Sequence, residues 1–125
     1  MLGNTVAVAT IAVRDLARSA EFYGGKLGFE PQESVEGEVL VYRTGESSLF
    51  VYRSEYAGTN KATAATFVVG DELAPIVKAL TARGVDFEHY DLPGMEREGE
   101  IHSGGGMKVA WFKDPDGNII SLTSG

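Results

Sequence analysis

The apolar positions of the chain alternate between two periods, one typical of strands and one typical of helices. Residues 6–13 form a short apolar run, which predicts a strand. Asp15 follows as a favourable helix N-cap, and Gly28 is suited to end the helix. Between them the apolar residues recur at helical spacing, at Leu16, Ala20, Tyr23 and Leu27. We therefore predict a strand followed by an amphipathic helix, which the pair Gly24-Gly25 bends or frays.

Three further strands are predicted after this helix. The apolar runs lie at residues 29–35, 39–44 and 49–53. Turn-forming residues separate them, with Glu36-Gly37-Glu38 after the first run and Gly45-Glu46-Ser47-Ser48 after the second. The first half of the chain therefore reads β-α-β-β-β.

The pattern then begins again, which indicates an internal repeat. Residues 54–63 read as a linker because they hold few large apolar residues. Residues 9–15 match residues 65–71 at a constant offset of 56, and Gly28 falls on Gly84 without a gap. The second half therefore repeats the strand and the helix of the first.

The last part of the repeat contains an insertion. After a helix capped by Asp71 and a strand at residues 87–90, the closing hairpin aligns with the first half at an offset of 70. The change from 56 to 70 places about 14 extra residues between Asp91 and Met107. Connections of this length are more often lids or binding loops than spacers. The glycines at 104–106 are then the hinge of such a lid.

Two tandem β-α-β-β-β modules predict an α+β fold with curved mixed sheets. Each sheet has a helix on one face and contributes the other face to a concave groove. We place a single domain over residues 1–125, with module 1 at about residues 6–54 and module 2 at about residues 64–123.

The alternation of side chains along a strand assigns residues to these two faces. Thr10 is predicted to face the groove, because its two neighbours face the helix. In the closing hairpin, a pairing of Phe112 with Ile120 places both residues under the second helix. Trp111 then lies opposite Ser121 on the concave side. A shift of the pairing by one residue would exchange the two faces.

Composition narrows the class of protein. The chain has 125 residues, a formal net charge of −7 and no cysteine. The absence of cysteine rules out a disulfide or zinc-thiolate framework and fits a reducing compartment. No run approaches the roughly 20 apolar residues that span a bilayer, and the surplus of acidic residues disfavours nucleic-acid binding. We expect a cytoplasmic protein that binds neither membrane nor nucleic acid.

Two stretches carry a resemblance to a known family. The first is Ala12-Val13-Arg14-Asp15-Leu16-Ala17-Arg18-Ser19, with Phe22-Tyr23 and Leu27-Gly28-Phe29 behind it, and the second is Trp111-Phe112-Lys113-Asp114-Pro115-Asp116-Gly117-Asn118. They resemble the vicinal oxygen chelate superfamily, which includes glyoxalase I, extradiol dioxygenases and bleomycin-resistance proteins. With the paired modules, the resemblance covers essentially the whole chain. It implies the fold, but helix caps, packing residues and turns imply no particular reaction.

The resemblance also implies where a metal ion would be held. In the metal-dependent branches, His or Glu near the start of each module's first strand and Glu near the end of its last strand hold a divalent ion. Those places here are Val8, Val51, Ala64 and Ser121. Valine and alanine have no ligand atom, and a neutral serine hydroxyl is a poor ligand for such ions. We therefore expect no metal and no cofactor, and neither glyoxalase I nor extradiol dioxygenase activity.

A relocated site is the alternative. The two histidines are His89 and His102, and His102 lies near Glu100 in the insertion. These three side chains would supply nitrogen and oxygen ligands, or a general base for a lyase or isomerase. The simpler interpretation is that His102 is solvated in an acidic loop and that His89 ends a strand. No nucleophile or third orienting group accompanies them, so no catalytic residue is assigned.

What remains is a largely apolar groove with a few polar points, which is typical of a small-molecule site. Its predicted lining is Val8, Thr10, Val51, Ala64, Thr66, His89, His102, Met107, Val109, Trp111 and Ser121. The leading hypothesis is a metal-independent binding protein of bleomycin-resistance type with an aromatic or cationic ligand. A ligand-free subunit or interaction module is a further alternative. The resemblance also implies a homodimer that completes the groove.

Overall fold

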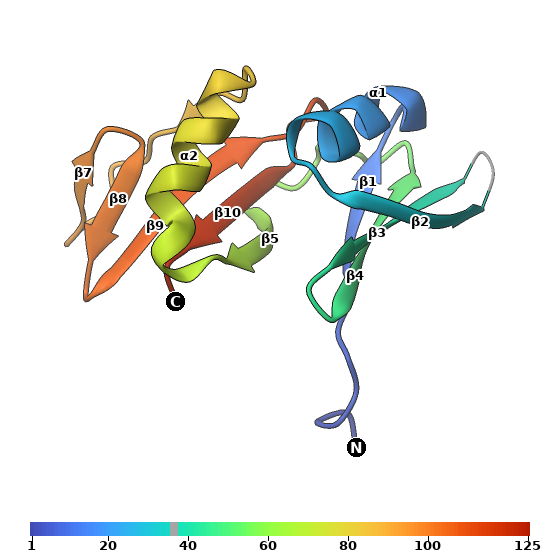
Figure 1. The fold of residues 1–125 in the computed structure, drawn as a ribbon, viewed down its shortest axis with the longest axis horizontal. Helices are drawn as coiled ribbons and strands as arrows, with labels where there is room; N and C mark the ends of the chain where they lie inside the picture. Colours follow the sequence, from blue (N-terminus) through green and yellow to red (C-terminus); the bar gives the residue numbers. More distant parts are fainter. Residues whose placement is uncertain (36–37) are drawn as a thin grey trace.

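The computed structural model describes residues 1–35 and 38–125 and arranges them as two sheets, each with one helical segment on one face (Figure 1). The first half consists of β1 (Ala9–Val13), α1 (Leu16–Ala20), η1 (Glu21–Lys26), β2 (Glu30–Val35), β3 (Val39–Thr44) and β4 (Ser47–Arg53). The second consists of β5 (Thr63–Val68), η2 (Gly70–Glu72), α2 (Leu73–Ala82), β6 (Phe87–Glu88), β7 (Glu96–Glu98), β8 (Ile101–Gly104), β9 (Met107–Lys113) and β10 (Ile119–Thr123). The predicted α+β fold with mixed sheets is confirmed. The turn predicted at Glu36-Gly37-Glu38 lies outside the described residues at its first two positions.

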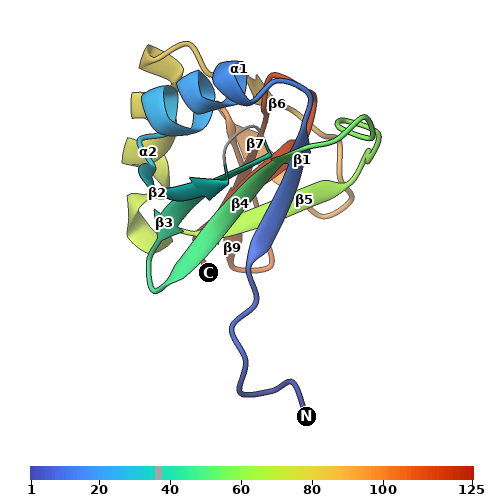
Figure 2. The same cartoon turned by 90° about the vertical axis from the view of Figure 1, so that its right-hand side faces the viewer.

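The two sheets have the same strand order at their inner ends, which is the structural form of the repeat. Sheet A has the order β1-β4-β3-β2, and sheet B has the order β5-β10-β9-β8-β7, with β6 also paired to β9. In each sheet the first strand runs parallel to the last strand of its module, and all other pairs are antiparallel. Strands β1 and β5 are in contact, so the modules meet along these two edges (Figure 2).

The first helical segment begins as predicted and then changes its form. The Asp15 carboxylate accepts a hydrogen bond from the Arg18 backbone N–H (3.2 Å), which caps α1. After one turn the segment becomes the π-helix η1, which contains Gly24-Gly25. Gly28 follows with φ of +78°, the left-handed conformation that ends a helix. The predicted irregularity at the two glycines is therefore a widened helical turn.

The cap predicted for the second helix is wrong. Asp71 lies inside the short 3₁₀ turn η2, and α2 starts after Glu72, whose side chain forms no capping hydrogen bond in the described part of the chain. Gly70 has φ of +59°, and this turn directs the chain into the helix instead. Gly84 ends α2 with φ of +86°, in the same way that Gly28 ends the first segment.

A single hydrophobic core joins the two modules. Ile11 and Val13 of β1 are buried under α1, and Phe112 and Ile120 are buried under α2. Phenylalanine rings cross the boundary between modules: the centroids of Phe29 and Phe67 lie 5.3 Å apart and those of Phe22 and Phe112 lie 6.1 Å apart. Since these rings belong to both halves, neither module buries its apolar face alone.

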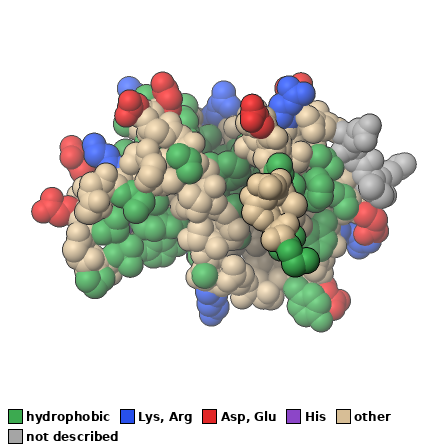
Figure 3. All heavy atoms as spheres, turned by 90° about the horizontal axis from the view of Figure 1, so that it is seen from below, with side chains coloured by type: hydrophobic (Ala, Val, Ile, Leu, Met, Phe, Trp, Pro, Cys, Tyr) green, Lys and Arg blue, Asp and Glu red, His purple; other side chains and the backbone are tan. Residues whose placement is uncertain are grey.

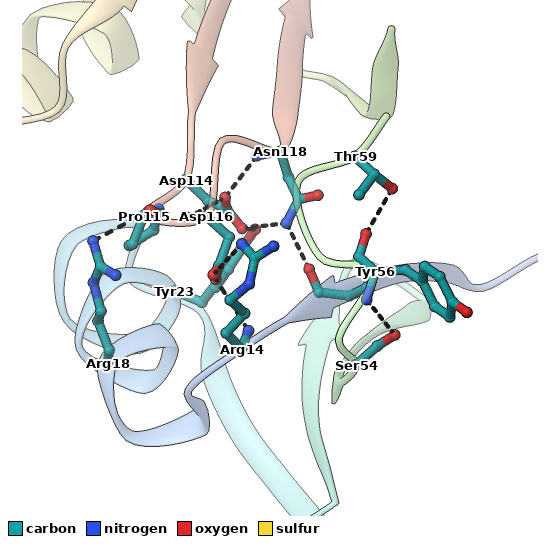
Figure 4. A network of polar contacts seen from close by, with 11 residues as sticks. Arg14, Arg18, Tyr23, Ser54, Tyr56, Thr59, Asp114, Pro115, Asp116 and Asn118 are labelled. Atoms are coloured by element: carbon teal, nitrogen blue, oxygen red, sulfur yellow. Dashed lines mark hydrogen bonds and ion pairs between the residues drawn. The ribbon is translucent and has the colours of Figure 1, made fainter. Parts of the chain in front are cut away.

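The turn between β9 and β10, residues 114–118, forms a polar clasp between the modules (Figure 4). Asp114 is 5 % exposed, and its Oδ1 accepts hydrogen bonds from the backbone N–H groups of Asp116 (2.9 Å) and Asn118 (2.8 Å). Its Oδ2 accepts from the Tyr23 hydroxyl (2.7 Å) and from the Asn118 side-chain amide (2.8 Å). The same amide also donates to the carbonyl oxygen of Ala12 (2.7 Å). The turn thus binds the end of β1 and the helix of module 1.

The outer side of the clasp is held by more exposed contacts. Arg18 Nη2 donates to the carbonyl oxygen of Pro115 (3.2 Å), and the Arg14 backbone N–H donates to the Asp116 carboxylate (3.3 Å). Gly58 of the linker lies directly against the backbone of Asp116 and has φ of +73°. The linker and both modules therefore meet at this one turn.

We expect the folded protein to lose stability at alkaline pH, because the clasp contains the buried hydroxyl of Tyr23. Burial, followed by the Asp114 carboxylate, raises the pKa of the Tyr23 hydroxyl above its ordinary value near 10. Above pH 10 the unfolded chain loses this proton while the folded chain keeps it. The unfolded state then binds fewer protons, so stability is complete below about pH 10 and falls as the pH rises, by up to about 1.4 kcal/mol per pH unit for this one site.

Urea unfolding between pH 8 and pH 11 measures this slope. Tyr23→Phe removes the titrating hydroxyl and is expected to reduce the slope. A residual slope remains, because burial also raises the pKa of Tyr42. An alkaline slope identical in the wild type and in Tyr23→Phe would contradict the assignment.

Candidate functional site

The helix-free face of sheet B brings together several of the residues predicted to line a groove. Trp111 pairs with Ser121, as predicted, and Ser121 pairs with Thr66 across the parallel strands. The hydroxyl oxygens of Ser121 and Thr66 are 2.6 Å apart and share a hydrogen bond. Val109, two residues before Trp111, lies on the same face and pairs with His102 of β8. The predicted register of the closing hairpin is therefore confirmed.

The insertion is more ordered than a lid. Its second half forms the hairpin β7–β8, and β8 pairs with β9, so the insertion extends sheet B. Gly105 and Gly106 have φ of +60° and +78°, and they join β8 to β9 in a two-residue turn. Two consecutive positive φ angles are the requirement of the type I′ hairpin turn. The interpretation of residues 104–106 as a hinge is therefore wrong: these glycines close a hairpin.

The first half of the insertion crosses the helix-free face beside this hairpin. A Cβ atom on Gly104 would lie 2.5 Å from the carbonyl oxygen of Gly94 and 3.1 Å from the side chain of Met95. The backbone N–H of Tyr90 donates to His102 Nε2 (3.0 Å). This bond explains why β6 ends at Glu88, two residues before the predicted strand end: the chain leaves β9 to cover His102.

Three rings form the centre of the site. The Trp111 indole is half-buried and meets the ring of Tyr90 edge to face, with centroids 5.1 Å apart and an interplanar angle of 82°. His102 meets it in the same manner at 4.9 Å and 78°. We call Tyr90, His102 and Trp111 the aromatic cluster. Edge-to-face contacts of this kind hold ring planes at right angles and favour one orientation of the indole.

Two polar atoms of the aromatic cluster are buried without a hydrogen-bond partner among residues 1–35 and 38–125. They are His102 Nδ1 and the Tyr90 hydroxyl oxygen. Because His102 Nε2 accepts a hydrogen bond, the neutral ring carries its proton on Nδ1, which is therefore a donor. Burial raises the pKa of Tyr90, with a smaller contribution from Glu88, so the hydroxyl stays protonated at neutral pH. Unpaired buried donors each cost roughly 1–3 kcal/mol.

The three residues predicted for a relocated site, His89, Glu100 and His102, do not all lie where the sequence placed them. His102 is 1 % exposed and is not solvated in a loop. His89 Nε2 lies 2.9 Å from Glu100 Oε2 at the surface, and its ring centroid is 6.3 Å from that of His102. In the part of the chain that the structure describes, no three His, Asp or Glu side chains are grouped to hold a metal ion. A lyase or isomerase site at these residues stays a prediction.

The predicted position of Val51 in the groove is wrong. Val51 pairs with Ile11 and Leu40, is fully buried and belongs to the core. The reason is one extra residue in the closing turn. Thr44 pairs with Ser47 across two residues, whereas the Asp114 N–H reaches the carbonyl oxygen of Asn118 across three.

Because of this extra residue, β4 and β10 align at an offset of 71 and not 70. Leu49 pairs with Tyr42 in the same way that Ile120 pairs with Phe112, so Leu49 and Ile120 are equivalent core positions. The counterpart of Ser121 is then residue 121 − 71 = 50, which is Phe50. Its side chain is 37 % exposed on the helix-free face of sheet A. A one-residue shift exchanges the two faces of a strand. The repeat alignment at an offset of 70 therefore places Val51, and not Phe50, on the helix-free face of sheet A.

The remaining predicted lining residues lie at the margins. Thr10 is exposed on sheet A, and its hydroxyl donates to the carbonyl oxygen of Val8 (3.3 Å). Ala64 is exposed at an irregularity of β5, where the pairing with β10 shifts by one residue. Met107 is 43 % exposed where β9 leaves its turn. Val8 is partly buried and lies just before β1. The structure therefore gathers the sheet B residues around Trp111, and these four residues lie outside the aromatic cluster.

The positions implied for a metal ion do not fit one. With the corrected register they are Val8, Phe50, Ala64 and Ser121, and the first three have no ligand atom. Ser121 is 4 % exposed, and its hydroxyl is already bonded to Thr66. Divalent ions of this kind require imidazole or carboxylate ligands, so the chemistry of these side chains argues against a metal at this place.

Tyr90 is the member of the cluster that sequence reasoning missed. The sequence places Tyr90 at the end of a predicted strand. In the structure the chain has already left that strand, and the Tyr90 backbone N–H donates to His102. An aromatic residue directly before a long insertion is a weak signal, because only the path of the insertion decides where its ring lies.

Comparisons with known proteins agree with this architecture. The family model described as the glyoxalase/bleomycin resistance protein/dioxygenase superfamily matches residues 5–122. Among solved structures, an integron cassette protein from the mobile metagenome of a Halifax Harbour sewage outfall has a TM-score of 0.72 at 20 % identity, over 97 % of this chain and 98 % of that one. A lactoylglutathione lyase from Agrobacterium tumefaciens has a TM-score of 0.72 at 16 % identity, over 96 % and 92 % of the chains.

A third similar structure is a glyoxalase/bleomycin resistance protein from Catenulispora acidiphila, with a TM-score of 0.69 at 25 % identity over 94 % of this chain and 95 % of that one. No curated protein matches the chain. Among the described residues, none of the helices has the length and apolar character needed to cross a membrane.

Proposed function

The chain belongs to the glyoxalase/bleomycin resistance protein/dioxygenase superfamily, and we propose that within it the protein is a metal-independent small-molecule-binding protein. The observation that carries the proposal is the aromatic cluster. It places a half-buried indole beside two buried polar atoms that have no partner in the described chain. Such a combination of apolar surface and a few convergent polar groups is typical of ligand sites.

The cluster also defines the kind of ligand. The Trp111 indole offers a surface on which a planar aromatic ring or an organic cation packs. A hydrogen-bond acceptor on a ligand that reached His102 Nδ1–H would pair with this donor. Pairing this donor removes part of the cost of burying it, so an acceptor group next to the ring strengthens binding.

We further propose that the binding unit is a homodimer. The helix-free face of sheet A exposes Phe50 and Tyr52, which are 37 % and 38 % exposed, next to Thr10 and Ala12. Within one chain this apolar face does not cover the aromatic cluster, which lies on the other sheet. A second copy that placed its sheet A over sheet B would bury both surfaces and complete the groove.

Titration tests the proposal, with proflavine as a planar cation and bleomycin as a flat bithiazole joined to a cationic tail. The buffer contains EDTA, and calorimetry gives the affinity while light scattering gives the mass of the complex. We expect saturable binding of at least one probe, with one site per chain on a dimer. Trp111 is the single tryptophan of the chain, so its fluorescence reports the site directly.

Trp111→Leu is expected to weaken probe binding at least tenfold, because the packing surface is lost. Tyr56→Leu removes an aromatic ring that is 70 % exposed in the linker and serves as the control, with affinity within twofold of the wild type. Binding that requires a divalent ion, or that is equal in wild type and Trp111→Leu, would overturn the proposal. An absence of saturable binding by both probes in the folded dimer counts against it as well.

A further inference from the structure

A cavity lies between the two modules, away from the aromatic cluster. Its volume is about 540 Å³, which is within the usual range for sites that hold a small molecule. Leu27 and Phe29 form its wall in module 1, and Ile76 and Leu80 of α2 form the opposite wall. In the view from below, hydrophobic side chains are visible in the recess between the two halves (Figure 3). We call this cavity the inter-module cleft.

The floor of the cleft is the hydrophobic core itself. Phe112 and Leu122 line it, although they are only 1 % and 5 % exposed, and Phe67 lines it from β5. The ring contact between Phe29 and Phe67 spans the two modules at the same place. A molecule in the cleft would therefore pack against residues that hold the modules together.

None of the sixteen lining residues is charged. Charged residues make up 23 % of the chain, so a random sample of this size would hold about four. The polar residues of the lining are concentrated on the turn between β3 and β4, at Thr44, Ser47 and Ser48. An ion that entered such a site would lose its hydration without gaining a counter-charge. A neutral molecule with one polar end matches both the walls and this rim.

We propose that the inter-module cleft binds a neutral, largely apolar small molecule whose single polar end lies at the β3–β4 turn. The site is separate from the aromatic cluster and does not depend on the function proposed for that cluster. It also differs in the charge it accepts, because the cleft offers no cationic or anionic side chain to a ligand.

Two fluorescent probes with the same ring system test this selectivity. N-phenyl-1-naphthylamine is neutral, and 1-anilinonaphthalene-8-sulfonate carries one negative charge on the same skeleton. We expect the neutral probe to bind the full-length protein saturably at one site per chain and the sulfonate to bind at least tenfold more weakly. Equal affinity for both probes, or no saturable binding of the neutral one, would overturn the proposal.

Matched tryptophan variants of α2 locate the probe. Ile76→Trp fills the cleft and is expected to weaken binding of N-phenyl-1-naphthylamine at least tenfold, whereas Ala79→Trp, at an exposed position of the same helix, keeps the affinity within twofold. Circular dichroism verifies folding, and Ala9→Phe fills the cleft from β1 if Ile76→Trp fails to fold. If neither Ile76→Trp nor Ala9→Phe weakens binding, the probe lies elsewhere and the proposed site in the cleft is rejected. If Trp111→Leu weakens binding of the probe and Ile76→Trp does not, the probe lies at the aromatic cluster instead.

Discussion

Asp114→Ala is expected to lower the free energy of unfolding by about 3–5 kcal/mol, because it removes the acceptor at the centre of the clasp. The Tyr23 hydroxyl, two backbone N–H groups and the Asn118 amide all donate to this carboxylate. Alanine leaves these donors in a site that is 5 % exposed at Asp114, where water replaces the lost bonds poorly. The loss is large because the Tyr23 bond joins the two modules and the other three bonds hold the turn in its shape.

Urea denaturation followed by circular dichroism measures this change. Tyr23→Phe removes one donor and leaves the other three in place, so a smaller loss of about 1.5–3 kcal/mol is expected. This variant keeps the prediction testable if Asp114→Ala does not fold. Tyr56→Phe deletes a hydroxyl from a ring that is 70 % exposed and is the matched control, with a change within about 0.5 kcal/mol. Equal losses in Tyr23→Phe and Tyr56→Phe would show that the clasp carries no stability.

Gly58→Ala is expected to destabilise the protein by about 2–4 kcal/mol, through backbone strain and a collision. Gly58 has φ of +73°, which alanine adopts at a cost, and a Cβ atom there would overlap the carbonyl oxygen of Asp116. That oxygen belongs to the backbone of the clasp and has no rotamer by which to move away. Relief of the overlap therefore displaces either the linker or the turn.

Gly45→Ala is the matched control for this prediction. Gly45 also has a positive φ, +55°, but among residues 1–35 and 38–125 no atom beyond its chain neighbours lies within 4 Å of the position of its Cβ atom. Its alanine variant experiences only the strain of the left-handed conformation, about 1 kcal/mol. Thermal unfolding of the two variants separates the backbone strain from the collision, and the difference in stability between Gly58→Ala and Gly45→Ala measures the collision. Variants that unfold at the same temperature would show that the linker does not press on the turn.

Local signals predicted the parts of the fold that depend on neighbouring residues. The Asp15 cap, the helix ends at Gly28 and Gly84, and the pairing of Trp111 with Ser121 are all confirmed. Each depends on a short stretch whose backbone conformation or alternation leaves few choices.

The errors occurred where the count of residues in a turn decides the outcome. The repeat alignment places Val51 in the groove because it passes through two hairpin turns of different length. The glycines at 104–106 suit a hinge and a hairpin turn equally, because glycine serves both mobile loops and tight hairpins. In both cases the alternatives are equally compatible with local propensity, and strand pairing with distant residues selects one of them.

The amino-acid sequence by itself determined the tandem repeat and the unsuitability of Val8, Ala64 and Ser121 as metal ligands. These follow from periodicity and side-chain chemistry, which no folding changes. Only the tertiary structure decided that Tyr90 packs on Trp111 beside a buried His102, and that a cleft with an uncharged lining lies between the modules. Both features arise from contacts between segments far apart in the chain, whose positions are set by the packing of the shared core.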